Sequence, residues 1–295
     1  MPFTTASEEE RDLIVKEVLA KIPQVEEKVE SGVRIVVTGK GGVGKTVISA
    51  VLAHLLADAG FNVLAVDEDP QMNLPFALGL PFDEAEAIVP LNRQLDYIEE
   101  KTGVRPGSGW GLFFKLNPDV SDVVERFGIR VKDRLNLLVM GTVMQPSIGC
   151  ACPENDLLQA VVNYINLRKG EFIIMDTEAG LEHFGRAIAK GFHHAIIISE
   201  PTFNSIYVMR QAVKLAKGLG IRNIHLVFNK VRDEEEKVRQ FLSKFEAEFS
   251  GLPVYFLPYD ENIQKAEPSV QTILENGATK FVDAVMQILK NLLQD

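Results

Sequence analysis

The feature that most constrains this chain is a glycine-rich loop placed between a short apolar run and a helical pattern. The apolar run is Val33–Thr38, and the loop after it reads Gly39-Lys40-Gly41-Gly42-Val43-Gly44-Lys45-Thr46. Glycines at these spacings let backbone N–H groups converge on phosphate oxygens, and the start of a helix adds positive potential. In such a loop the lysine neutralises the β- and γ-phosphates and the threonine hydroxyl binds Mg²⁺. The loop therefore predicts a nucleotide site with Lys45 and Thr46 in these roles.

Short apolar runs alternate with helical patterns along the rest of the chain, and this alternation indicates the fold class. Continuous apolar runs of this length are typical of strands buried in a parallel sheet. We expect an α/β fold, with a mostly parallel β-sheet and helices on both faces. The expected strands are Val33–Thr38, Phe61–Asp67, Leu135–Met140, Phe172–Met175, Ala195–Ser199, Ile224–Phe228 and Val254–Leu257. The clearest helical patterns are Pro153–Leu167, Ser205–Leu219 and Asp233–Glu248, and the irregular stretch Pro81–Asp133 is expected to flank the nucleotide end of the sheet.

Charge and hydropathy exclude several classes of partner. The chain has 31 Lys and Arg against 41 Asp and Glu, a formal net charge of −10, which argues against binding nucleic acid or anionic membrane. No run approaches the ~18 apolar residues of a membrane span, and the acidic N-terminus lacks the apolar core of a signal peptide, so we expect a cytoplasmic protein. Residues 1–32 are expected to form a helical extension, with an amphipathic helix over Ser7–Val29, and residues 33–295 the nucleotide-binding domain.

The two lysines of the loop, Lys40 and Lys45, resemble the deviant Walker A motif of the MinD, ArsA and nitrogenase-iron-protein class of ATPases. That resemblance implies a homodimer in which Lys40 reaches across the interface to the phosphates of the partner subunit. Val47 departs from the class, which often has a second threonine there to contact the α-phosphate. The expected nucleotide-binding backbone runs from Gly39 to Val47.

Two acidic strand ends resemble the switch segments of the same class. Asp67-Glu68-Asp69-Pro70 stands at the end of one expected strand. The resemblance implies that Asp69 orients the attacking water and that Asp67 interacts with Mg²⁺ indirectly, through the ligands of the ion. Asp176 ends another apolar strand and corresponds to the aspartate that holds Mg²⁺. Gly180, four residues later, would present its N–H group to the γ-phosphate.

Base recognition rests on two shorter segments. Asn229-Lys230 ends an expected strand and resembles the Asn-Lys segment in which the asparagine side chain reads adenine. Pro258 follows the last expected strand and looks like the start of the loop that closes over the base. ATP and ADP are therefore the nucleotides that the resemblance implies.

The chain has two cysteines, Cys150 and Cys152, one residue apart and directly before Pro153. Proline suits the first position of a helix, so Cys152 lies at a helix N-terminus, where the dipole favours the thiolate. Two thiolates only half complete a tetrahedral site for Zn²⁺ or a similar soft ion, and an identical chain across a twofold axis would supply the other two. Alternatives are two buried structural cysteines, a strained redox disulfide, or an iron–sulfur cluster bridging two subunits.

The cysteine pair on this scaffold resembles one family more closely. The deviant loop, Asp69-Pro70, Cys150-x-Cys152 with Glu154-Asn155, and Asp176-x-x-Ala179-Gly180 with Glu182-His183 are similar to the CooC family, the nickel-insertion ATPases of carbon monoxide dehydrogenase and acetyl-CoA synthase. The resemblance implies an ATP-hydrolysing metallochaperone that binds Ni²⁺ or Zn²⁺ at Cys150 and Cys152 and delivers nickel to one of these client enzymes. Rival hypotheses are an electron-transfer ATPase or carrier with a bridging iron–sulfur cluster, and a MinD- or ParA-like positioning switch.

Overall fold

The structure is a computed structural model, and it describes residues 32–106, 118–141, 153–165, 170–179, 191–275 and 280–294. The expected N-terminal helix, the cysteine pair and Gly180 lie outside these residues.

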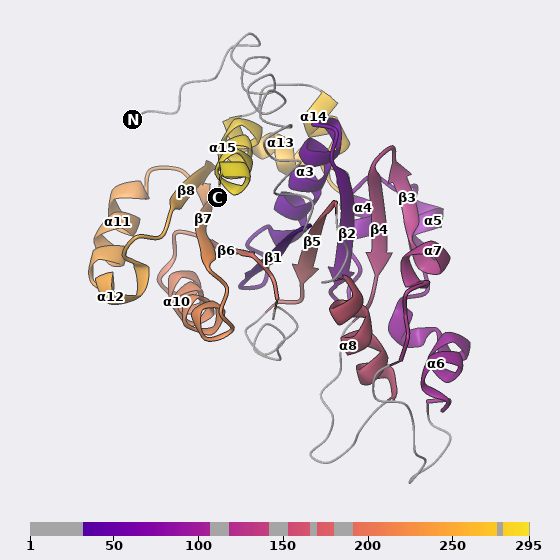
Figure 1. Cartoon of the computed structure of the whole chain (residues 1–295). Coiled ribbons are helices and arrows are strands. Elements are labelled where there is room, and N and C mark those ends of the chain that lie inside the picture. Colours follow the sequence, from indigo (N-terminus) through magenta and orange to yellow (C-terminus); the bar gives the residue numbers. More distant parts are fainter. Residues whose placement is uncertain are drawn as a thin grey trace.

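The fold is built on an eight-stranded sheet with the order β3-β4-β2-β5-β1-β6-β7-β8 (Figure 1). All neighbouring pairs are parallel except β3 and β4. The strands span β1 Val33–Gly39, β2 Asn62–Glu68, β3 Ile129–Lys132, β4 Leu135–Val139, β5 Glu171–Thr177, β6 His194–Ser199, β7 Asn223–Val231 and β8 Val254–Pro258. The seven apolar runs of the sequence are therefore strands, and the predicted fold class is confirmed.

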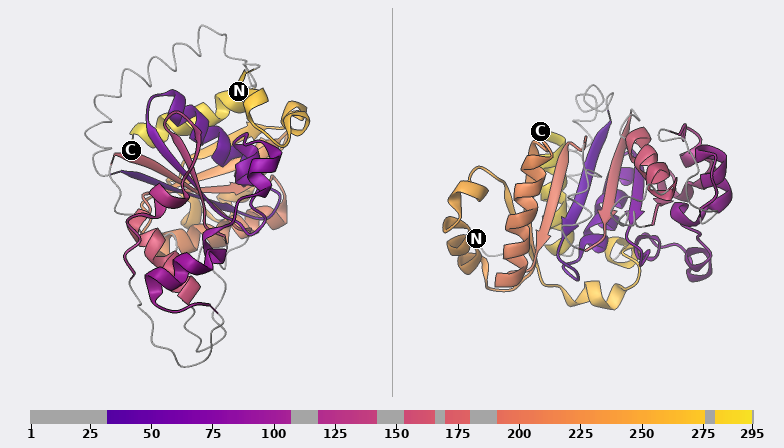
Figure 2. Two further views of the ribbon diagram at one scale, coloured as in Figure 1. Left: turned by 90° about the vertical axis from the view of Figure 1, so that its right-hand side faces the viewer. Right: turned by 90° about the horizontal axis from the view of Figure 1, so that it is seen from below.

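Helices cover both faces of the sheet (Figure 2). Side chains from successive positions of one strand enter two separate cores. On β1, Ile35 and Val37 belong to one core and Val36 to the other, as the alternation of side chains along a strand requires. The first core lies under α3 Lys45–Asp58, α4 Leu74–Ala77, α14 Gln271–Glu275 and α15 Lys280–Gln294. The second lies under α6 Leu95–Thr102, α7 Val123–Phe127, α8 Pro153–Ile165, α10 Phe203–Gly218, α11 Glu235–Ser243 and α12 Glu246–Phe249. The remaining helices in the described part of the chain are α5 Phe82–Glu86, η1 Leu91–Arg93 and α13 Glu261–Ala266.

The sequence did not predict two features of this arrangement. Strand β3 pairs antiparallel with the edge of the sheet and is only partly buried, so it lacks the continuous apolar run of the other strands. The single helix expected over Asp233–Glu248 is two helices, because the chain leaves helical geometry at Phe245 (φ −125°, ψ 41°). Phe245 and its neighbour Leu242 pack against the second core at this break.

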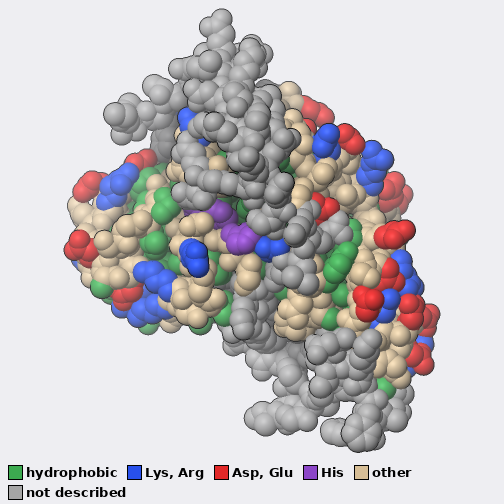
Figure 3. All heavy atoms as spheres, in the orientation of Figure 1, with side chains coloured by type: hydrophobic (Ala, Val, Ile, Leu, Met, Phe, Trp, Pro, Cys, Tyr) green, Lys and Arg blue, Asp and Glu red, His purple; other side chains and the backbone are tan. Residues whose placement is uncertain are grey.

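On the face drawn in Figure 3, acidic and basic side chains are intermixed over the side of the molecule that carries α5, α6 and α7. Arg105 pairs there with Asp96 at 2.6 Å, and Arg126 pairs with Glu100 at 2.8 Å. Among the described residues no helix is long and apolar enough to span a membrane.

Candidate nucleotide site

The site lies where β1, β2 and β5 end at one edge of the sheet. The parallel register places Asp67 of β2 opposite Asp176 of β5, and Val37 of β1 opposite the same Asp176. The glycine-rich loop leaves β1 at Gly39 and runs into α3 at Lys45. Carboxyl ends of neighbouring parallel strands are where α/β folds bind ligands, and the predicted loop and two acidic strand ends meet here.

Two glycines of the loop stand where a side chain would not fit. A Cβ atom on Gly39 would lie 2.3 Å from the carbonyl oxygen of Ile198, on the neighbouring strand β6. Gly44 has φ +96°, in the left-handed region, and a Cβ there would lie 2.5 Å from Nδ2 of Asn229. Glycine is therefore needed for packing at Gly39, where the neighbour is backbone, and for the left-handed conformation at Gly44.

Lys45 and Asp176 face each other at the base of the site. Lys45 is 7% exposed and its Nζ lies 3.5 Å from the carbonyl oxygen of Lys40. Burial lowers the pKa of Lys45, while the nearby carboxylates of Asp176, Asp69 and Glu178 act in the opposite direction. Burial raises the pKa of Asp176 to about 6, although hydrogen bonds from Thr46 and Ser49 and the charge of Lys45 oppose the increase.

The oxygen donors around Asp176 fit a magnesium ion. The Asp176 carboxylate is 1% exposed, and the Ser49 hydroxyl donates to it at 3.1 Å. The Thr46 side chain hydrogen-bonds to the same carboxylate. A buried carboxylate beside the hydroxyl of Thr46, which lines the cavity, is the kind of hard oxygen donor set that Mg²⁺ takes. Asp176 and Thr46 would hold the ion, whose charge would neutralise the phosphates.

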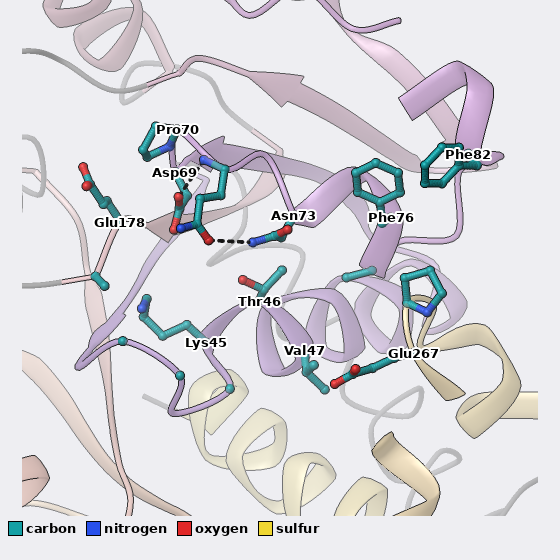
Figure 4. A pocket seen from close by; sticks show the side chains of 17 residues that line it. Lys45, Thr46, Val47, Asp69, Pro70, Asn73, Phe76, Phe82, Glu178 and Glu267 are labelled. Atoms are coloured by element: carbon teal, nitrogen blue, oxygen red, sulfur yellow. Dashed lines mark hydrogen bonds between the residues drawn. The ribbon is translucent and has the colours of Figure 1, made fainter. Parts of the chain in front are cut away.

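Asp67 organises the segment that carries Asp69. Its Oδ1 accepts the N–H of Asp69 at 2.9 Å and its Oδ2 accepts the N–H of Leu74 at 3.1 Å. Burial, followed by the charge of Asp176, raises the pKa of Asp67 well above its usual value. The Asp69 carboxylate accepts the N–H of Gln71 at 2.9 Å and lines the cavity above Lys45 (Figure 4). Both aspartates predicted from the sequence therefore lie at the site, one as a support and one facing the cavity.

A cavity of about 740 Å³ opens between the loop and this segment. The loop, Asp69 and Glu178 lie on one side of the cavity, and Phe76, Phe82 and Glu267 lie on the other (Figure 4). The full lining consists of Gly41, Gly42, Gly44, Lys45, Thr46, Val47, Asp69, Pro70, Gln71, Asn73, Phe76, Ala77, Phe82, Glu178, Ala179, Glu267 and Pro268. The cavity is large enough for a small-molecule ligand of nucleotide size.

Of the two residues expected to read the base, Asn229 contacts the loop directly. The side-chain amide of Asn229 donates to the carbonyl oxygen of Val43 at 2.8 Å. Pro258 pairs with Val231, two residues after Asn229, so the ends of β7 and β8 lie together. Neither Asn229 nor Pro258 lines the cavity described above.

Several residues at the site carry no signal in the sequence. Ser49, one helical turn after Lys45, reaches Asp176, and Glu68 is buried behind the site, where burial raises its pKa to about 8. Glu178 lines the cavity from within the Asp176–Gly180 segment, at a position to which the sequence assigned no role, and Glu267 lines it from a segment without a recognisable motif. Sheet register places Glu68 and Glu178 near one another, and the positions of α3 and of the chain after α13 bring Ser49 and Glu267 to the same site.

Three comparisons with known proteins agree with this geometry. The sequence pattern of the CobQ/CobB/MinD/ParA nucleotide binding domain matches residues 34–273. An uncharacterized ATP-binding protein of Methanocaldococcus jannaschii is 39% identical over 261 residues, which cover 88% of this chain and 98% of that protein. The carbon monoxide dehydrogenase accessory protein CooC of Rhodospirillum rubrum is 36% identical over 234 residues, 79% of this chain and 86% of that protein. In the MinC:MinD cell division complex of Aquifex aeolicus, a chain with a TM-score of 0.62 and 21% identity covers 89% of this chain and 96% of its own length, which supports the fold alone.

The chain therefore belongs to the CobQ/CobB/MinD/ParA nucleotide-binding family. It is an ATPase of the MinD/ParA class, and a CooC protein is among its relatives.

Proposed function

We propose that this protein is an ATP-driven metallochaperone that delivers nickel to carbon monoxide dehydrogenase or acetyl-CoA synthase. The observation that carries the proposal is the 36% identity to a carbon monoxide dehydrogenase accessory protein over 79% of the chain. The sequence adds the pair Cys150-x-Cys152, which suits a soft metal ion held as cargo.

The proposed reaction is hydrolysis of ATP to ADP and phosphate. Water attacks the γ-phosphorus, the bond to the β-γ bridging oxygen breaks, and Asp69 orients the water from its place at the cavity wall. Lys45 and the backbone N–H groups of the loop stabilise the negative charge that develops on the phosphate oxygens. Gly180 contributes a further N–H group, and the base lies toward Asn229 and Pro258, beyond the lining of the described cavity.

Lys40 is the residue through which we propose that two chains share the reaction. It is exposed, whereas Lys45 in the same loop is buried. An exposed lysine beside a phosphate site is free to neutralise charge on a nucleotide bound by a second chain. The homodimer would form when nucleotide is bound, and loss of the γ-phosphate would weaken it.

The described residues suggest how nucleotide could be sensed at the cysteines. Cys150 and Cys152 belong to the segment between Gly141 and Pro153. At the start of that segment, the N–H of Met140 donates to the carbonyl oxygen of Asp67 at 2.9 Å. Asp67 also accepts the N–H of Asp69. A displacement of the Asp69 segment on loss of the γ-phosphate would therefore be transmitted through Asp67 to the end of β4, which leads to the cysteines. Such coupling is reciprocal, so metal and nucleotide must change each other's affinity.

A positioning switch of the MinD kind is the alternative from another class. A membrane-binding switch would need a basic amphipathic helix with a free apolar face. The apolar residues of the C-terminal helix α15 are instead buried in the first core: Phe281, Val285, Ile288, Leu289 and Leu292. This packing favours the metallochaperone.

The test is anaerobic equilibrium binding of Ni²⁺ under reductant, with and without MgADP. We expect about half an ion per chain, because a four-thiolate site takes two sulfurs from each of two subunits. The Cys150→Ser variant should lose this binding, and MgADP should change the affinity of the wild type.

A Cys150→Ser protein that binds nickel as the wild type does would overturn the proposal. A brown protein as purified, with a redox-active absorbance, would instead indicate the bridging iron–sulfur cluster. Nickel binding by cysteine with no response to MgADP would refute the coupling to ATP.

A further inference from the structure

Two consecutive residues near the end of β7, one buried and one exposed, each donate to a backbone carbonyl of the phosphate-binding loop. Asn229 donates through its side-chain amide to Val43 O at 2.8 Å. Lys230 donates through Nζ to Gly42 O at 2.8 Å. The same ammonium group also contacts Glu200 Oε1 at 2.7 Å, so it bridges the loop to the end of β6.

Both ends of this bridge are fixed by their own backbone contacts. Lys230 has φ +60°, a left-handed conformation unusual for a residue with a side chain, and its N–H donates to Asn229 Oδ1 at 2.9 Å. The N–H of Glu200 donates to Ser205 Oγ at 3.0 Å, and its carbonyl oxygen accepts the Ser199 hydroxyl at 2.8 Å. The lysine and the glutamate are thus presented by ordered backbone on two adjacent parallel strands.

The direction of these bonds determines where the loop's donors point. In a planar trans peptide the carbonyl and the next N–H point in opposite directions. Because Gly42 O and Val43 O are held toward Lys230 and Asn229, the N–H groups of Val43 and Gly44 are turned to the other side of the loop. Gly42 and Gly44 line the cavity, whereas Lys230 and Asn229 do not. The bonds therefore turn two N–H groups toward the place of the phosphates.

We propose that Lys230 and Glu200 form a latch that holds the phosphate-binding loop in its binding conformation before nucleotide arrives. Lys230 is a positioning residue, because it acts through the peptide of Gly42. Glu200 balances the charge of the Lys230 ammonium group and orients it, so that the hydrogen bond from Nζ to Gly42 O is kept. Gly42 and Gly44 have φ +77° and +96°, and a loop with such freedom needs external restraints to keep one conformation.

The inference rests on nucleotide binding at this loop, and the test is titration of the full chain with a fluorescent ATP analogue. The Lys230→Met variant keeps the length of the side chain but has no donor. Loss of one charge-assisted hydrogen bond that preorganises the loop should raise Kd about tenfold. With ATP bound, the loop of the variant reaches the same conformation as in the wild type. At saturating ATP its kcat should therefore stay within about twofold of the wild-type value, and the weaker binding should appear as a higher KM. Lys230→Arg keeps a cationic donor and should restore most of the affinity.

Lys217→Met is the matched control. Lys217 also donates to a backbone carbonyl, Glu248 O at 2.7 Å, but it lies at the far end of α10. The Lys217→Met substitution should therefore leave the Kd for the ATP analogue unchanged. As a single substitution, Glu200→Gln should raise Kd about threefold. Added to Lys230→Met it should have no further effect, as expected when two residues act through the same interaction.

Hydrogen exchange of the nucleotide-free protein gives a second readout. Lys230→Met should speed exchange in residues 39–46 only, whereas a loss of general stability would speed it throughout the chain. A Lys230→Met protein with wild-type Kd and wild-type exchange in the loop would overturn the latch. A wild type that binds no ATP analogue would overturn the proposed function itself.

Discussion

The close approach of Gly39 to strand β6 gives a prediction that can be worked from the structure. In Gly39→Ala the new Cβ would lie 2.3 Å from Ile198 O and 3.2 Å from its carbonyl carbon. Both neighbours are backbone atoms of a paired strand, so β1 and β6 must separate by about 1 Å for an ordinary contact. Overpacking of this kind and the unfavourable φ of +153° together should cost about 3 kcal/mol.

This cost converts to a change in melting temperature. An unfolding entropy of about 2.1 cal/mol/K per residue gives about 0.6 kcal/mol/K for this chain, so Tm should fall by about 5 °C. Gly60→Ala is the matched control, since Gly60 also has a positive φ (+94°) but no atom within 4 Å of its Cβ position. Its cost should be the conformational one alone, about 1 kcal/mol, and its Tm should fall by less than about 2 °C.

The assay is thermal unfolding of the wild type and both variants, with titration of an ATP analogue on each. Gly39 begins the phosphate-binding loop, so Gly39→Ala should also lose at least about tenfold in nucleotide affinity, and Gly60→Ala should lose none. Equal Tm values for the two variants would refute the reasoning, because the clash with Ile198 would then cost nothing.

Three further predictions concern catalysis, affinity and pH. Lys40→Ala should abolish most ATP hydrolysis, by about a thousandfold in steady-state assays, while a titration finds ADP affinity nearly unchanged; ordinary turnover would contradict its proposed role across the dimer. Val47→Thr should tighten ATP binding about threefold to tenfold in the same titration, because Val47 lines the cavity and a hydroxyl there could donate to the α-phosphate. Burial, then the charges of His225 and His193, lowers the pKa of His194 to about 3, so the unfolded state binds the proton more readily and stability should fall as pH drops from about 6.5 toward 3. In denaturant titrations the free energy of unfolding should fall by up to about 1.4 kcal/mol per pH unit because of His194, and His194→Leu should remove this contribution. An unchanged pH dependence in the variant would refute the assignment.

Much of the fold could be predicted from the sequence, because buried parallel strands need continuous apolar runs. Val33–Gly39 and Glu171–Thr177 are such strands, and their pattern has no other simple explanation. Strand β3 could not be predicted, because its residues Ile129–Lys132 are partly exposed and include two basic side chains. Its place in the sheet depends on pairing with β4 rather than on its own sequence.

The candidate site divides in the same way. The loop, Asp69 and Asp176 could be recognised in the sequence. The loop is a contiguous motif with fixed spacing, and each aspartate stands at or just after the end of an apolar strand. Ser49 and Glu200 are brought to the site by helix position and sheet register, which a single sequence does not reveal. Lys230 belongs to a segment that the sequence indicated, but its contact with Gly42 O appears only in the fold. The cysteine pair lies outside the described residues, so its metal site remains a prediction.

The most direct test of the proposed function is transfer of nickel to a client enzyme. Nickel-loaded protein is mixed anaerobically with nickel-free carbon monoxide dehydrogenase or acetyl-CoA synthase, and the nickel content and activity of the client are measured with MgATP, with a non-hydrolysable analogue, and with the Lys45→Ala variant. We predict that one client gains nickel and activity only with MgATP and the wild-type protein. Equal transfer without hydrolysis would contradict an ATP-driven metallochaperone, and no transfer to either client would contradict nickel delivery.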